Sequence, residues 1–95
     1  MTDFFDISDC NLPSERVVEF VQRARRIHKI RGLKLSSNHL TTQGFEKIID
    51  SLKGVGNINL ANNEVNEGIF DLLIKNRDRM DALKIINLSH NPINF

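Results

Sequence analysis

The stretch "LKLSSNHL" at residues 33–40 decides the fold that the sequence predicts. Its apolar residues Leu33, Leu35 and Leu40 have near-alternating spacing, which indicates a short strand with one buried face. Asn38 interrupts this apolar pattern and would have no defined place in a simple strand. The remainder of the chain accounts for the asparagine, because the same pattern returns.

Three further copies of the pattern occur in the chain. "INLANNEV" (58–65) and "INLSHNPI" (86–93) keep both the apolar spacing and the asparagine. "FDISDCNL" (5–12) keeps the spacing but has Cys10 at the asparagine position. Recurrence at a fixed register indicates a repeat architecture. We therefore expect repeats that start near residues 5, 33, 58 and 86, the last of them truncated.

Helical patterns separate the copies. Apolar residues at i, i+3, i+4 and i+7 predict a half-buried helix after each of the first three copies. Pro13 and Ser14 predict the start of the first helix, Thr41 or Thr42 that of the second, and "KGVG" (53–56) its end. The apolar stripes are Val17, Phe20, Val21, Ala24 and Ile27; Phe45, Ile48, Ile49 and Leu52; and Ile69, Leu72 and Leu73, with Met80 and Leu83 beyond.

The order is therefore strand, helix, strand, helix, strand, helix, strand. Two architectures share this order. A small doubly wound parallel sheet would need longer apolar strands that are buried on both faces. A solenoid has short strands that line a concave face. The asparagines at a fixed register favour the solenoid.

The pattern resembles the leucine-rich repeat, LxxLxLxx(N/C)xL, and its length is similar to that of the ribonuclease-inhibitor and Ran GTPase-activating-protein subclass. The resemblance implies an α/β fold: a short right-handed solenoid of about four repeats, with parallel β on the concave face and helices on the convex face. It covers nearly all of residues 1–95 as one domain. The family tolerates cysteine at the asparagine position, which suits Cys10. Gly44 and Gly68 also fit, whereas the first copy has Arg16 in that region.

Composition bounds the possible functions. The 95 residues are 40% hydrophobic and 26% charged, with a net charge of +1, so no bulk charge attracts nucleic acid or membranes. A single cysteine excludes an internal disulfide framework. No stretch approaches the ~20 apolar residues of a membrane span, and the first residues lack signal-peptide features. We expect a cytoplasmic protein.

The asparagines are expected to be structural. In this fold the chain bends sharply after each strand, and the backbone groups left inside must be paired. An asparagine side chain offers both a donor and an acceptor. Asn38, Asn63 and Asn91 are therefore predicted to form a hydrogen-bonded ladder. Cys10 is predicted to be its buried terminal rung, with a weak S–H donor.

Function in such a fold is expected on the concave face. The outward side chains there are mostly small and polar, and only Phe4 and Ile85 at the row ends come close to the aromatic and arginine residues that anchor tight interfaces. A hydrated sheet without a tight partner is therefore the competing interpretation. The predicted partner-binding residues are Asp6, Lys34, Ser36, Asn59, Asn87, His39 and His90.

A basic flank ends the first predicted helix. It comprises Arg25, Arg26, Lys29 and Arg31. An anionic partner, such as nucleic acid or a phosphate-rich lipid, would explain it. The preference for cations at helix C-termini would also explain it and is favoured here. Nucleic acid is not favoured as a partner, because no aromatic residues alternate with the cations.

We predict no enzyme, cofactor or metal site. His39 and Glu64 occupy equivalent loop positions, but a metal or acid–base pair there would lack a third ligand. Cys10 has no neighbouring general base. The predicted function is a non-catalytic protein–protein interaction module, acting through the concave face or a solenoid end. A GTPase regulator is an alternative by family analogy alone, since no motif of that kind can be placed on this chain.

The ends of the solenoid are a further expectation. The fourth strand would leave Leu88 and Ile93 at an open end, and an unpaired strand edge invites another chain. We expect either a homo-oligomer through this end or a chain that is part of a longer protein. Alternatively, Pro92 and Phe95 fold back as a minimal cap.

Overall fold

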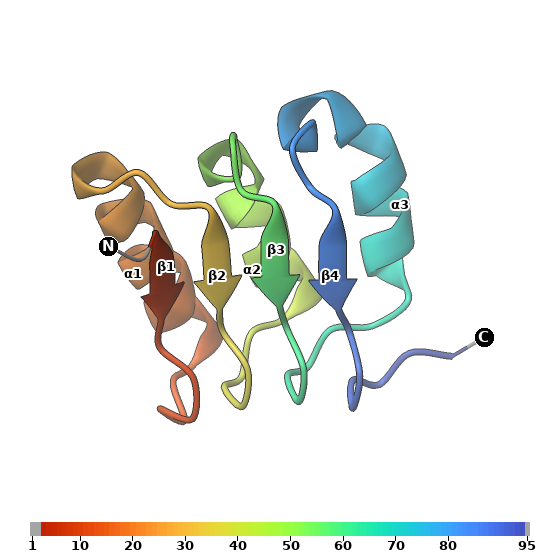
Figure 1. The fold of residues 1–95 in the computed structure, drawn as a ribbon. Helices are drawn as coiled ribbons and strands as arrows, with labels where there is room; N and C mark the ends of the chain where they lie inside the picture. Colours follow the sequence, from red (N-terminus) through yellow and green to blue (C-terminus); the bar gives the residue numbers. More distant parts are fainter. Residues whose placement is uncertain (1–2, 95) are drawn as a thin grey trace.

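The computed structural model describes residues 3–94 of the protein (Figure 1). Over these residues the chain forms an α/β fold with a four-stranded parallel sheet and three α-helices. The elements are β1 (Phe4–Asp6), α1 (Ser14–Ile27), β2 (Gly32–Lys34), α2 (Thr42–Ile48), η1 (Ile49–Ser51), β3 (Asn57–Asn59), α3 (Gly68–Lys75), η2 (Arg77–Met80) and β4 (Ile85–Asn87). The predicted α/β class, parallel sheet and alternation of strands with helices are confirmed.

The strands follow one another across the sheet in chain order, β1-β2-β3-β4. Phe4, Gly32, Asn57 and Ile85 lie opposite one another in successive strands, so the strands begin in register. Figure 1 shows the helices on one face of the sheet, while the other face is uncovered. The uncovered face is therefore available for contact along the whole width of the sheet.

The core lies between the sheet and its helices. Ile58 and Leu60 of the third strand region are fully buried, and so is Phe45 of α2. Their counterparts in the outermost strand, Ile86 and Leu88, are only partly buried. An inner strand has neighbours on both sides and an outer strand has one. Because full burial of such a side chain contributes roughly 1.5–3 kcal/mol, the middle of the sheet is held more firmly than its edges.

The helix starts depend on two hydroxyl side chains. Thr41, rather than Thr42, caps α2, since its Oγ1 accepts a hydrogen bond from the amide of Gly44 at 3.1 Å. Ser14 does not cap its own helix. Its Oγ instead accepts a hydrogen bond from the amide of Thr41 at 3.1 Å, which ties the start of α1 to the start of α2. Pro13 precedes α1 with φ −67°, a backbone angle suited to helix entry.

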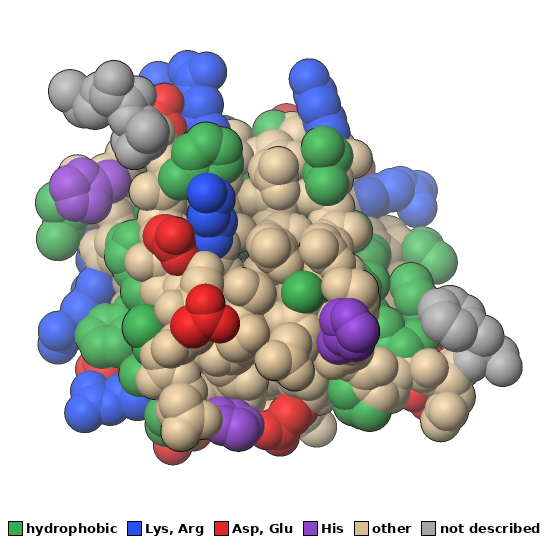
Figure 2. Space-filling view, turned by 60° about the horizontal axis from the view of Figure 1, so that its bottom comes forward, with side chains coloured by type: hydrophobic (Ala, Val, Ile, Leu, Met, Phe, Trp, Pro, Cys, Tyr) green, Lys and Arg blue, Asp and Glu red, His purple; other side chains and the backbone are tan. Residues whose placement is uncertain are grey.

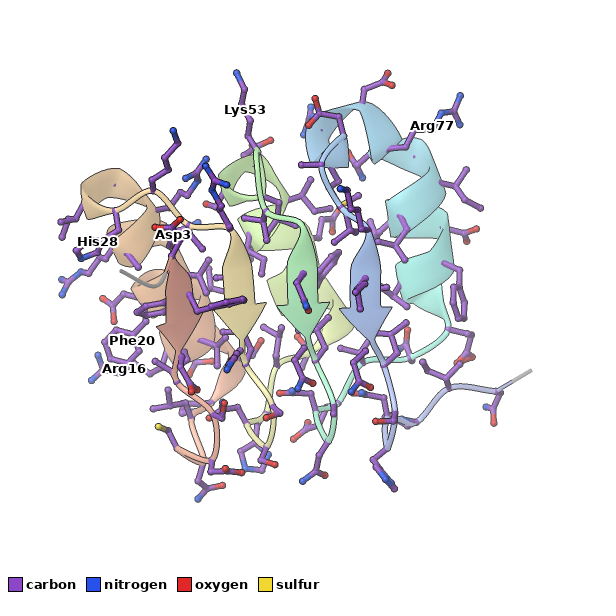
Figure 3. All side chains as sticks on the ribbon, in the orientation of Figure 1. Asp3, Arg16, Phe20, His28, Lys53 and Arg77 are labelled. Carbon is purple, nitrogen blue, oxygen red and sulfur yellow. The ribbon has the colours of Figure 1, made fainter. Side chains whose placement is uncertain are left out.

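Ile27 corrects one prediction. It was expected in the buried stripe of the first helix, but it is 75% exposed. Ile27 and Phe20 lie seven residues apart on one side of α1, opposite the side where Gln22 donates to the carbonyl of Lys47 in α2. Figure 3 places Phe20 on that outer side. Ile27 is exposed because α1 is the outermost helix and no described element covers this side.

Within residues 3–94, every helix is too short or too polar to cross a lipid bilayer.

Candidate functional site

Each strand is followed by a turn of the same backbone conformation. Asp9, Ser37, Asn62 and His90 occupy equivalent places and have φ between 56° and 59°. Among residues other than glycine, asparagine, aspartate and histidine are the most frequent in this left-handed region, and the short polar side chains of the first two bond locally. The recurring turn sends the chain from the sheet towards the helix layer and sets the positions of the side chains around it.

Asn38 and Asn63 make the same hydrogen bonds one strand apart. The Asn38 Oδ1 accepts from the amide of Leu12 at 2.9 Å, and its Nδ2 donates to the carbonyl of Ile7 at 2.9 Å. The Asn63 Oδ1 accepts from the amide of Leu40 at 2.9 Å, and its Nδ2 donates to the carbonyl of the Leu35 residue at 3.0 Å. Both asparagines are buried, so they belong to the framework of the molecule rather than to a binding surface.

Asn91 continues this arrangement at the last turn. Its Oδ1 accepts from the amide of Val65 at 2.9 Å, and its Nδ2 donates to the carbonyl of Leu60 at 2.8 Å. No buried side-chain nitrogen or oxygen among the described residues lacks a hydrogen-bond partner. The three asparagines thus make the hydrogen bonds expected of a ladder.

Cys10 was predicted to be buried, and this prediction is wrong. Its thiol is exposed, and its Sγ lies 3.4 Å from the carbonyl oxygen of Ser8. Cys10 belongs to the turn after β1, the outermost strand, so no preceding turn of the described chain covers it. The Cys10 side chain bonds only within its own turn, whereas each asparagine side chain also bonds to backbone groups of the preceding copy of the pattern.

The predicted concave residues Asp6, Lys34, Asn59 and Asn87 form one row across the uncovered face, opposite one another in successive strands. Three of them are held by the chain itself. Asp6 accepts a hydrogen bond from the amide of Ser8 at 2.9 Å, and Asn59 and Asn87 accept from the amides two residues further on, at 3.0 Å each. These bonds fix the side-chain orientations before any partner binds.

Asp6 and Lys34 give the row its charges. The hydroxyl of Ser8, which donates to Asp6 Oδ1 at 2.5 Å, together with the Ser8 amide and the nearby Lys34 charge, lowers the pKa of Asp6 below its ordinary value. The Lys34 ammonium lies 5.1 Å from the centre of the Phe4 ring, within cation–π range. Phe4 and Ile85 are 49% and 58% exposed and form the two ends of the neighbouring row.

Figure 2 shows this face together with the turns below it. Most of its surface is backbone and uncharged polar side chains, and charged groups gather over one part of it. Ser36 is half-buried two residues after β2, while His90 is exposed at the last turn and has no hydrogen-bond partner among residues 3–94. The predicted site residues therefore form a row on the sheet and a separate set along the turns.

His39 joins three successive turns. Its Nδ1 lies 2.6 Å from Glu64 Oε2, and its Nε2 lies 2.5 Å from Asn11 Oδ1. Isolated parallel bridges, Pro13 with His39 and Thr41 with Glu64, align the backbone there. The side chains border an open hollow of about 310 Å³. Sequence reasoning placed His39 and Glu64 at equivalent positions but did not predict their hydrogen bond, which depends on rotamers.

The chemistry available along the turns is hydrogen bonding. Within the described part of the chain, no group of three histidine, cysteine, aspartate or glutamate side chains could hold a metal ion. Both ring nitrogens of His39 have oxygen partners, so the ring is tied into the surface rather than directed at a nucleophile.

The basic flank surrounds a second hollow, of about 230 Å³, at the end of the molecule where the strands begin. It is lined by Arg25, Lys29, Ile30, Arg31, Lys53 and Gly54. Arg26, which the sequence placed in the flank, is exposed outside this lining. The sequence prediction of the basic flank did not include Lys53. Lys53 follows Arg25 by 28 residues, the same offset as between the first two copies of the pattern, and this repeat spacing could have placed the two residues together.

Comparison with known proteins finds no family model that matches the chain and no curated protein that is significantly similar to it.

Proposed function

We propose that the chain is a short leucine-rich-repeat solenoid that binds another protein, without catalysis, through the uncovered face of its sheet. The in-register strands and the recurring hydrogen bonds of Asn38, Asn63 and Asn91 support the repeat. In such a fold the helices cover one face of the sheet, and the partner contacts the other.

The observation that carries the function is the preoriented row on that face. The side-chain oxygens of Asn59 and Asn87 accept hydrogen bonds within their own turns. Their side-chain nitrogens, Nδ2, have no hydrogen-bond partner among the described residues. These nitrogens are donors whose orientation costs little entropy on binding. Lys34 adds one cation, and Phe4 and Ile85 add apolar contact at the two ends.

The shape of the face favours a protein rather than a small molecule. Ser36 and Ala61 are small and half-buried, so the backbone lies close to the surface there, whereas the Phe4 ring lies over the buried Gly32. A partner with longer side chains fits such a flat, polar surface by broad complementarity. The described residues offer no enclosed pocket and no paired catalytic groups on this face, which supports binding over catalysis.

The test is a pull-down from extract of the source cells with matched variants. Lys34→Glu with Asn59→Arg should remove partners, because it reverses one charge and places a bulky side chain in the row. Lys47→Glu with Gln43→Arg makes the same charge changes on exposed positions of α2 and should retain them. Retention of the same partners by both double variants would exclude the sheet face as the binding surface.

A further inference from the structure

The 230 Å³ hollow at the basic flank brings together cations from two parts of the chain. Arg25 lies in the last turn of α1, Lys29 and Arg31 follow that helix, and Lys53 belongs to the turn after η1. No acidic side chain lines this hollow. Figure 3 shows Lys53 at the same end of the molecule as Asp3, directed away from the body of the fold.

The positive charges in the hollow are only partly offset. The Arg31 Nε lies 3.4 Å from Asp3 Oδ2, which pairs this one guanidinium. Arg25 donates to the carbonyl of Lys53, a bond that holds its side chain across to the second part of the site. Lys29 and Lys53 are exposed, and neither has an ion-pair partner among residues 3–94. Of the four cations that line this hollow, one thus pairs with a carboxylate, that of Asp3, and Lys53 also borders the hollow of Asp50, Asp78 and Asp81 without an ion pair to them. The cations left unpaired repel one another, and an anion in the hollow would relieve this repulsion.

The helix dipole explains only part of this cluster. Cations within the last turn of a helix interact favourably with its C-terminus, and Arg25 fits that rule. Lys29 and Arg31 lie beyond the end of α1 at Ile27, and Lys53 belongs to a different element. The dipole effect falls off within one turn, so it reaches Lys29 but does not account for Arg31 or Lys53.

The end of α3 provides an internal comparison. The hollow nearest to it contains three aspartates, Asp50, Asp78 and Asp81, and Arg79 pairs with Asp50 at 3.0 Å. Cations after this helix are therefore accompanied by acids. Lys53 lies between the two hollows and forms no ion pair with the three aspartates. A general preference for cations after helices would give these two hollows the same composition, but the basic hollow has no acid in its lining. Asp3 and Lys29 line a neighbouring hollow at the end of α1.

We propose that this hollow binds phosphate monoester groups on a ligand that carries more than one of them. Guanidinium groups match phosphate oxygens in a bidentate geometry, and lysine adds a compact charge. Four cations less the one paired with Asp3 leave three, which exceeds the charge of roughly −2 on one monoester. The hollow is smaller than the ~300–1,000 Å³ of sites for drug-sized ligands, so it suits a phosphate group rather than a whole molecule.

The lining favours this ligand over nucleic acid. Single-stranded nucleic acid is held by aromatic stacking along a groove, and no aromatic side chain lines the hollow. Gly54, at φ 81°, adds no side chain to the wall, and a Cβ there would meet nothing within 4 Å, so the entrance is open. This site and its ligand are independent of the protein-binding face proposed above.

Titration calorimetry of the whole chain at about 50 mM salt tests the proposal, because low salt limits screening of surface charges. The probes are inositol hexakisphosphate and phosphatidylcholine vesicles that contain phosphatidylinositol 4,5-bisphosphate. Saturable binding to either probe is expected. Lys29→Gln with Lys53→Gln should weaken it by about tenfold or more, since charged hydrogen bonds are lost. Lys47→Gln with Lys75→Gln removes the same charge from exposed positions outside the hollow and should leave binding within about twofold, since distant surface charges are screened.

The two probes separate the sources of phosphate. Binding to vesicles alone identifies a lipid headgroup, binding to the soluble probe alone identifies a free ligand, and either result supports the site. Three results would overturn it: no saturable binding to either probe, equal losses in the two double variants, or tighter binding of a single-stranded RNA oligonucleotide with the same dependence on Lys29 and Lys53. Thermal unfolding of both double variants checks that each is folded.

Discussion

Asn63 serves two neighbouring turns with one side chain. It bonds to the amide of Leu40 and the carbonyl of Leu35 in the preceding segment, and to the carbonyl of Leu60 in its own. An apolar residue of similar size would fill the space but leave these buried groups unpaired. We therefore expect Asn63→Leu to lower the free energy of unfolding by roughly 1–3 kcal/mol, measured by urea denaturation.

Cys10 supplies the matched control for this prediction. Its thiol is exposed and bonds only within its own turn, so Cys10→Ala should change the free energy of unfolding by no more than about 0.5 kcal/mol. If Asn63→Leu unfolded at the same urea concentration as the wild type, the ladder would not contribute to stability.

The lowered pKa of Asp6 predicts how the stability of the folded protein depends on pH. The bonds from Ser8 stabilise the charged carboxylate in the folded protein and hold its pKa below the ordinary value. The stabilisation is therefore present at neutral pH and is lost in the acid region, as pH falls through the folded-state pKa. Ser8→Ala should raise the pKa of Asp6 towards its ordinary value, as measured by NMR titration of the carboxyl carbon.

Lys34→Met is the comparison variant for Asp6. The Lys34 charge contributes less to the lowered pKa than the Ser8 hydrogen bonds do, so its removal should raise the pKa by less. An equal or larger effect of Lys34→Met would show that charge, rather than hydrogen bonding, controls this carboxylate.

The framework residues could be predicted from the sequence, and the site contacts could not. Asn38 and Asn63 were found because a recurring polar residue in an apolar pattern has a recurring cause. The burial of Cys10 was mispredicted because the same pattern position has different neighbours in an outermost turn. The bridge made by His39 depends on two rotamers, which spacing does not determine.

At the scale of elements, the starts of α1 and α2 form one packed unit around Gly44. A Cβ at Gly44 would come within 2.2 Å of Ser14 Oγ and 2.7 Å of Leu40 Cδ1. The helix propensity of alanine favours Gly44→Ala by about 1 kcal/mol, but overpacking costs about 1–3 kcal/mol. We expect the overpacking to dominate, because Ser14 is also held by Thr41, and the melting temperature to fall.

Two variants check this prediction. Gln43→Ala, at an exposed position of the same helix, tests the propensity effect alone and should leave the melting temperature unchanged or slightly higher. Ser14→Ala combined with Gly44→Ala removes the closest contact and should recover part of the loss. A melting temperature that rises in Gly44→Ala alone would mean that the two helix starts separate easily.

The positions of the strands and helices could be predicted where the repeated apolar pattern alone determined them. The order of strands and helices followed from the copies, but the extent of burial on α1 did not. Ile27 continues the apolar spacing of its helix, yet it lies on the side that faces no neighbour. Periodicity identifies a helix face, whereas its burial depends on whether another element packs there.

At the scale of the whole molecule, both sides of the sheet end in open strand edges. Among the described residues no strand pairs with the outer edge of β1 or of β4. Leu88 and Ile93 are half-buried beside β4, and Ile74 of α3 is 63% exposed. The predicted cap at this end involves Phe95, which lies outside the described residues. Exposed apolar groups beside an unpaired edge favour association with another chain.

We therefore expect the protein to self-associate through the end formed by β4 and α3. Sedimentation velocity should show a mass that rises with concentration in the micromolar range. Ile74→Glu should return the protein to a monomer, because it places a charge in the apolar contact without disturbing the core. Ile27→Glu makes the same change at the opposite end, where Ile27 is 75% exposed.

The pair of variants also distinguishes the two geometries of assembly. A two-fold dimer uses the same surface on both copies, so only Ile74→Glu should abolish it. A head-to-tail contact joins opposite ends and forms open chains, so both variants should abolish it and the wild type should show no limiting mass. We expect the two-fold dimer. If α3 of one copy packs antiparallel to α3 of the other, Ile74 of each copy lies near Phe70 of the other, which makes the contact self-complementary. A wild-type protein that stays monomeric at high micromolar concentration would exclude both geometries.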